Sequence, residues 1–134
     1  MPAPEPVHQP ELEDIGIINA LRRGTVPAQG LGRFSVGLDV EEQVIAGQLD
    51  VVARSGSDIK FIRGEYGSGK TFLIARALEI ARKKGFVTAQ VAISPVCPLH
   101  RLRSVYSQIT RSLHAGGEQN AFRSIIDAWL LSIE

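Results

Sequence analysis

The chain has 134 residues, of which 44% are hydrophobic, and its 15 basic residues nearly balance its 14 acidic ones. This length suits one ordinary domain, and a net charge of +1 gives too weak a field to indicate a nucleic acid or an anionic membrane as partner. The single cysteine, Cys97, excludes an internal disulfide and a metal site built from several thiolates. No run is apolar enough for a membrane span or a secretory signal, so we expect a cytoplasmic protein without a membrane segment.

The first half of the chain predicts a tail, two helices and a loop. Residues 1–13 are rich in proline and acidic side chains and are expected to be disordered. Residues 14–57 form the next region, in which "LEDIGIINALRRG" carries apolar residues at helical spacing and "TVPAQGLGRFSVGLD" is typical of an ordered loop. Asp39 is the expected N-cap of a second helix through "VEEQVIAGQLDVVARSG".

Residues 58–134 alternate between strand and helix patterns. A strand is expected in "IKFIRG", a helix from Lys70 to Lys84, a strand in "FVTAQVAI", a helix from Pro98 to "AGG", and a last helix in "FRSIIDAWLLSIE". This order predicts an α/β fold with a parallel sheet. Two strands are few for such a sheet, so we expect the first part of a domain: N-terminal helices, two strands and their flanking helices.

The stretch "GEYGSGKT" matches the Walker A pattern of a phosphate-binding loop. Its glycines let backbone N–H groups turn toward phosphate oxygens, Lys70 neutralises the β- and γ-phosphates, and the Thr71 hydroxyl is a ligand for Mg²⁺. A glycine-rich turn with an incidental lysine is the alternative. We therefore predict ATP and Mg²⁺ as cofactors. The predicted binding residues are Gly64, Glu65, Tyr66, Gly67, Ser68, Gly69, Lys70, Thr71 and Phe72.

Two side chains of this loop admit more than one interpretation, and so does a later helix. Glu65 is an acid in an anion-binding loop and is expected to point outward. Tyr66 either stacks near the base or packs on the loop, and packing is favoured. The helix "LHRLRSVYSQITRSLH" has basic residues beside its apolar face, which either contact a phosphate backbone or, as we favour, are simply solvated.

Hydrolysis needs a second acid that holds Mg²⁺, usually at the end of an apolar strand. Asp127 in "SIIDAW" comes closest, but its apolar neighbours follow a helical period. The other acids after Thr71 are Glu79, Glu118 and Glu134, and none follows an apolar strand. We therefore predict no catalytic residue in this chain.

Several stretches together resemble one family, the ATP-binding proteins of bacterial BREX phage-defence systems, of the kind called BrxD. They are "ALRRGTVPAQGLGRFSVGLD", "RGEYGSGKTF", "ISPVCPLHRLRSVY" and "IIDAW". The resemblance implies an AAA-like P-loop NTPase fold, a parallel-sheet sandwich that this chain contains incompletely, because it stops at Glu134 before a Walker B strand. It also makes Val36, Gly37 and Leu38 candidates for contact with the adenine, the alternative being a loop that only covers the sheet.

Three functions follow from these observations. The resemblance favours an ATP-binding module of a phage-defence ATPase, with other defence proteins or further copies of itself as partners. The missing acid favours a nucleotide-gated scaffold that binds ATP without turnover. A small P-loop kinase is the third, although "AISPVCP" supplies no substrate-binding acid.

Overall fold

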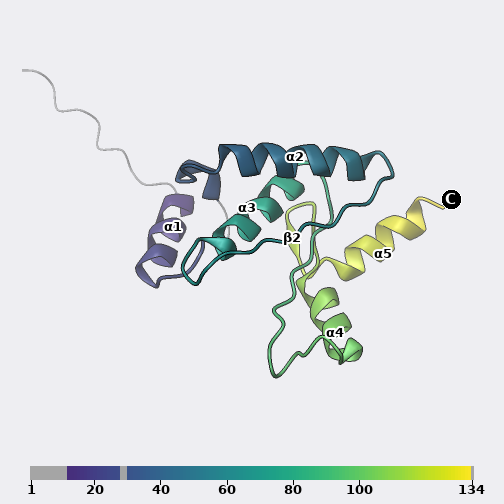
Figure 1. The fold of residues 1–134 in the computed structure, drawn as a ribbon. Coiled ribbons are helices and arrows are strands. Elements are labelled where there is room, and N and C mark those ends of the chain that lie inside the picture. Colours follow the sequence, from purple (N-terminus) through teal and green to yellow (C-terminus); the bar gives the residue numbers. More distant parts are fainter. Residues whose placement is uncertain (1–11, 28–29, 134) are drawn as a thin grey trace, which may run out of the picture. The chain divides into compact units, whose positions relative to one another are not determined.

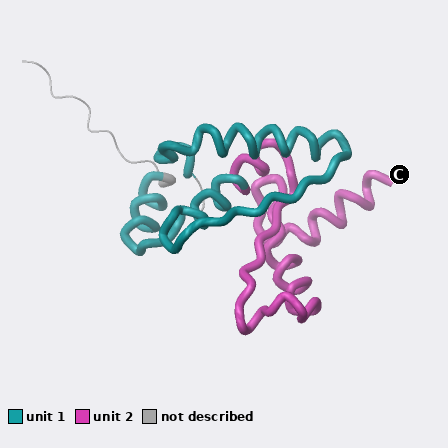
Figure 2. The backbone as a smooth tube through the Cα atoms, viewed as in Figure 1, with its two compact units in different colours: residues 1–77 teal, residues 78–134 magenta. Residues whose placement is uncertain are grey.

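The computed structural model describes residues 12–27 and 30–133. They divide into two compact units, residues 1–77 and 78–134 (Figure 2). Most of the predicted tail, residues 1–11, lies outside the described residues. The boundary between the units falls inside the third helix, α3 (Lys70–Lys83), so its first turns belong to one unit and its last turns to the other.

The first unit contains α1 (Leu12–Arg22), the short 3-10 helix η1 (Leu31–Arg33), α2 (Asp39–Ala53) and the beginning of α3 (Figure 1). The predicted end of α1 is confirmed, because Gly24 takes a φ of 67° and the N–H of Thr25 returns to the carbonyl of Ala20 at 3.0 Å. The predicted cap of α2 is one residue off: Leu38 is the N-cap, and Asp39 is already helical.

The second unit contains the end of α3, α4 (Leu102–Ser112), β1 (His114–Ala115), β2 (Glu118–Gln119) and α5 (Phe122–Leu131). The helix expected from Pro98 begins later, because the N–H of Arg101 first closes a turn onto the carbonyl of Pro98 at 3.0 Å. β1 and β2 pair antiparallel, with Ala115 opposite Glu118. The two glycines between them take φ values of 55° and 89°, which a two-residue hairpin turn requires.

The predicted parallel sheet is not formed by the described residues. Of the two expected strands, 59–64 and 86–93, only Thr88 makes a bridge, and it pairs antiparallel with His114. A strand exists through hydrogen bonds to a neighbouring strand, and no described segment offers such a ladder to residues 59–64. Phe61 in that segment is accordingly 92% exposed. The structure is therefore α/β and mostly helical, with one two-stranded antiparallel sheet.

Each unit buries a few small or medium apolar side chains. Ala20, Leu31 and Ile45 are buried in the first unit, and Ala81, Cys97 and Ala121 in the second. Cys97 is a free cysteine and packs here as a small apolar residue. Among the residues that the structure describes, no helix combines the length and apolarity needed to cross a bilayer.

Candidate functional site

Each glycine of the loop between residues 64 and 69 meets a steric requirement. Gly67 and Gly69 take φ values of 83° and 81°, in the left-handed region where a side chain is strained. A Cβ on Gly64 would stand 2.5 Å from Oγ of Ser68, so the loop closes on itself there. Within the loop the N–H of Ser68 donates to the carbonyl of Glu65 at 3.2 Å. The loop is a tight backbone turn that other residues would strain.

The beginning of α3 adds free donors to this turn. The first helical hydrogen bond runs from the N–H of Leu73 to the carbonyl of Gly69, at 2.9 Å. Among the described backbone bonds, the N–H groups of Lys70, Thr71 and Phe72 have no carbonyl partner, as expected for a first helical turn. These donors and the positive end of the helix dipole attract an anion.

The Lys70 ammonium lies over the same loop. Its Nζ donates to the carbonyl of Gly64 at 2.9 Å, also to the carbonyl of Glu65, and lies 3.4 Å from Oγ of Ser68. A full positive charge therefore lies on the same loop that leads into the free N–H groups of α3. This combination of cation, N–H donors and close backbone approach is what phosphate recognition needs.

A cavity of about 490 Å³ opens beside the loop. Its polar and charged lining residues come mostly from the loop, from Lys70 and from the residue before the loop. Its apolar lining residues come mostly from residues 34–38 and from α3, where the rings of Phe34 and Phe72 lie 5.5 Å apart and tilted by 52°. The lining residues are Phe34, Val36, Leu38, Glu41, Ile62, Arg63, Ser68, Gly69, Lys70, Phe72 and Leu73. A cavity with a cationic side and an aromatic side suits a nucleotide.

The apolar wall is held in place by an ion pair between α2 and α3. Arg76 of α3 donates from Nε to Oε1 of Glu42 at 2.7 Å and from Nη2 to Oε2 at 2.9 Å. Ser35, beside the wall residues, donates to the same carboxylate at 2.8 Å. The guanidinium also lies against η1, because a Cβ on Gly32 would stand 2.9 Å from Nη2 of Arg76. One carboxylate and one guanidinium thus join the segment around Phe34 to both helices.

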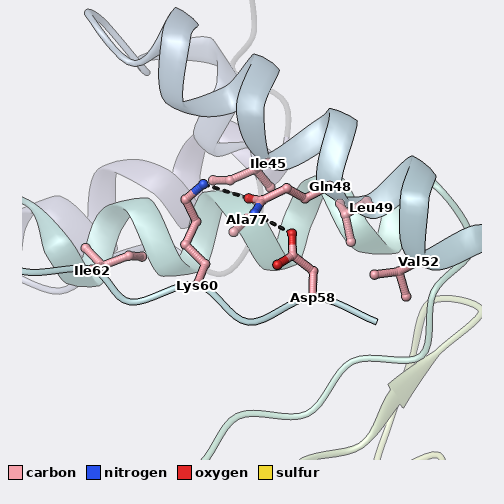
Figure 3. A pocket seen from close by; sticks show the side chains of 8 residues that line it. All are labelled: Ile45, Gln48, Leu49, Val52, Asp58, Lys60, Ile62 and Ala77. Atoms are coloured by element: carbon pink, nitrogen blue, oxygen red, sulfur yellow. Dashed lines mark hydrogen bonds between the residues drawn. The ribbon is translucent and has the colours of Figure 1, made fainter. Parts of the chain in front are cut away.

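A second contact holds the segment that leads into the loop (Figure 3). Gln48 of α2 donates from its amide to Asp58 at 2.5 Å and accepts from the Lys60 ammonium at 2.7 Å. These three residues share a cavity of about 210 Å³ with apolar neighbours that include Ile45 and Ile62. Residues 58–62 therefore run along α2 although they have no strand partner. Lys60 lies three residues before Arg63, which lines the cavity by the loop.

The predicted loop residues separate into three groups. Ser68, Gly69, Lys70 and Phe72 line the cavity, and Gly64 shapes the loop behind it. Gly67, Glu65 and Thr71 lie outside the lining, with Glu65 and Thr71 exposed, so the role of Thr71 as a Mg²⁺ ligand stays a prediction.

Tyr66 was expected to pack on the loop, and this is wrong. Its side chain is fully exposed, at 106% of the reference area. The ring stands at the tip of the turn, before Gly67, where the backbone reverses and offers it no surface.

The cavity also contains residues that the loop motif did not indicate. Val36 and Leu38 line it, so their contact with adenine stays a prediction, whereas Gly37 supplies a turn with a φ of 75°. Phe34, Glu41 and Arg63 were missed. An aromatic residue in a glycine-rich loop and a cation directly before the first loop glycine were the available signals for Phe34 and Arg63.

Of the acids after Thr71, the described ones lie on helices or on β2, and Glu134 lies outside the described residues. Asp127 is a residue of α5 and stands 3.8 Å from Arg123 one turn earlier, so its helical interpretation is confirmed. Glu79 pairs with Lys83 on α3 at 3.0 Å, and Glu118 accepts from Ser124 at 2.7 Å. None of these described acids follows an apolar strand.

Comparison with known protein families gives one match, to the family described as BREX system ATP-binding protein BrxC/D, over residues 10–134. The chain belongs to this family. The match includes the loop, the wall residues of the cavity and the whole second unit, so it confirms the resemblance seen in the sequence. No match was found among curated proteins or among solved structures. The description of this family as ATP-binding agrees with a cavity that is lined by the cations Arg63 and Lys70 and by the rings of Phe34 and Phe72.

Proposed function

We propose that this protein binds Mg²⁺·ATP through residues 64–72 and serves as the nucleotide-binding part of a BREX phage-defence system. The observation that carries the proposal is the junction of loop and α3. There the Lys70 ammonium lies over the loop, three N–H groups have no carbonyl partner among the described residues, and Lys70 and Phe72 line a cavity. Membership of a family of BREX ATP-binding proteins supports the choice of ATP and of a defence role.

Different residues of the site bind different parts of the nucleotide. The loop N–H groups and Lys70 hold the phosphates, and the Thr71 hydroxyl supplies a ligand to Mg²⁺, which neutralises phosphate charge. The apolar wall around Phe34 and Phe72 receives the base, because a flat ring system buries apolar area against aromatic side chains. Arg63 adds a second cation on the polar side.

Calorimetric titration with Mg²⁺·ATP tests the proposal. Lys70→Ala removes a charge-assisted contact to phosphate and should weaken binding by about 2 kcal/mol or more, roughly thirtyfold in Kd. The matched control is Lys83→Ala, which removes the same charge from the far end of α3, where Lys83 pairs with Glu79. Equal affinities for the wild-type and Lys70→Ala proteins would contradict the proposal.

Binding without turnover is the second candidate, favoured by the placement of the acids described above. An acid that shares Mg²⁺ with the loop is needed for phosphoryl transfer, and the described acids after Thr71 lie in α3, β2 and α5. We expect no Lys70-dependent phosphate release from this chain. Release by the wild-type protein at about one per second, within the usual enzyme range, that disappears in Lys70→Ala would exclude this candidate.

Partners of the protein are proposed on family membership. A component of a BREX system is expected to contact other proteins of that system or further copies of itself. Co-purification with the products of neighbouring system genes, with and without ATP, tests this expectation, and recovery of the protein alone in both conditions would contradict it.

A further inference from the structure

Glu41 is the acidic residue in the lining of the nucleotide cavity, and neither the loop motif nor the proposed function assigns it a role. It lies in the first turn of α2, a few residues after Val36 and Leu38, which line the same cavity. The cations Arg63 and Lys70 come from the loop and the residue before it. The acid therefore follows the segment that, in the proposed function, receives the nucleoside.

The Glu41 carboxylate is an open acceptor. Among the described residues it makes no hydrogen bond and no ion pair, whereas the next residue, Glu42, is engaged by Ser35 and Arg76. The other acid of the same turn, Asp39, does not line the cavity. The carboxylate of Glu41 thus accepts from nothing within this part of the chain, and the residue lines the cavity.

An ionised carboxylate accepts hydrogen bonds only, so its partner must be a donor. Phosphate is repelled. The adenine edge offers one amino donor beside a ring nitrogen that is itself an acceptor, so a carboxylate there meets attraction and repulsion together. The ribose offers two neighbouring hydroxyl donors, which match the two oxygens of one carboxylate. Acids fill this role in other nucleotide sites.

We propose that Glu41 accepts hydrogen bonds from the ribose 2′- and 3′-hydroxyls of the bound nucleotide and makes the site selective for ribonucleotides over deoxynucleotides. The inference rests on the proposed nucleotide site. It assigns a specificity residue to that site, and the ligand group it recognises is a vicinal diol.

Calorimetric titrations with Mg²⁺·ATP and with Mg²⁺·2′,3′-dideoxy-ATP test it. The wild-type protein should prefer ATP by about tenfold or more, as expected for hydrogen bonds to a charged acceptor. In Glu41→Ala the ratio of the two affinities should fall to about one, while the affinity for the dideoxynucleotide stays equal or rises. The ratio is informative because, if Glu41 had only a structural role, Glu41→Ala would weaken the binding of both nucleotides by the same factor.

Asp39→Asn is the matched control, since it removes one negative charge from the same helical turn without touching the cavity lining. It should keep the wild-type ratio. An affinity ratio near one in the wild-type protein, or a ratio unchanged in Glu41→Ala, would overturn the role of Glu41 and leave the proposed function standing. Failure of the wild-type protein to bind either nucleotide would overturn both.

Discussion

Gly69 takes a left-handed φ of 81° directly before the first residue of α3, so its backbone conformation disfavours any side chain there. A Cβ at this position would meet no atom within 4 Å, so the cost of a side chain there is backbone strain alone. Gly69→Ala should therefore lower the free energy of unfolding by about 1–2 kcal/mol and weaken ATP binding as the loop shifts. Denaturant unfolding and nucleotide titration measure the two effects.

Gly47 provides the opposite case for comparison. It lies inside α2, has open space around it and needs no positive φ. Gly47→Ala should raise the free energy of unfolding by about 0.5–1 kcal/mol and leave ATP affinity unchanged. If the two alanine variants behaved alike, the conformation assigned to Gly69 would be wrong.

His114 makes the second unit sensitive to acid. Its ring is 9% exposed, its Nδ1 is buried without a hydrogen-bond partner among the described residues, and Arg82 lies nearby. Burial first, and then the positive charge of Arg82, lower the pKa of His114 below its usual 6.5. The unfolded chain therefore takes up the proton at a higher pH than the folded chain does.

Because the pKa of His114 is lower in the folded chain than in the unfolded chain, acid destabilises the fold. The contribution of His114 to stability is complete above pH 6.5 and is lost as the pH falls from there through the folded pKa. His114→Asn should flatten the dependence of unfolding free energy on pH between about 7 and 5. His100→Asn, at an exposed position, should preserve it. If the unfolding free energy of His114→Asn fell with pH as steeply as that of the wild-type protein, His114 would not be the source of the acid sensitivity.

The ion pair between Glu42 and Arg76 joins α2 to α3 and is mostly buried, with 22% and 13% of the two side chains exposed. Removing one partner leaves a charge in a poorly solvated place, so Glu42→Gln and Arg76→Met should each lower the unfolding free energy by about 1–3 kcal/mol. Arg76→Lys should lower the unfolding free energy almost as much, because an ammonium cannot reproduce the bidentate contact.

A double-mutant cycle measures this coupling directly. The combined variant should cost less than the sum of the single ones, by about 1 kcal/mol or more. Additive costs would mean that the two side chains do not stabilise one another. Since Ser35 donates to the same carboxylate, both single variants should also weaken ATP binding through the wall around Phe34.

At the scale of elements, the helices could be predicted and the sheet could not. Helical spacing located α1, and the helix expected from Lys70 to Lys84 matches α3 to within one residue. Strands depend on a partner that a local pattern does not contain, so residues 59–64 were mispredicted. The hairpin of β1 and β2 was missed because its flanking residues have no β-type pattern, although the pair Gly116 and Gly117 was a usable signal.

For the whole molecule, the sequence located the loop of the candidate site, and the structure added the aromatic wall. A fixed spacing of glycines, Lys70 and Thr71 encodes the loop, because each position has a local backbone or charge requirement. The wall is assembled from residues distant in sequence, Phe34 and Phe72 among them, and only the fold brings them together. The family match over residues 10–134 includes both the loop and the wall.

We expect ATP to occupy the cavity between the loop and the aromatic wall. Amide NMR of the labelled protein during titration with Mg²⁺ and a non-hydrolysable ATP analogue measures this at each residue. The largest saturable shifts should occur at the amides of Lys70, Thr71 and Phe72, whose N–H groups have no carbonyl partner among the described residues, followed by those around Phe34 and Leu38. Shifts confined to the second unit, or none at saturating nucleotide, would contradict it.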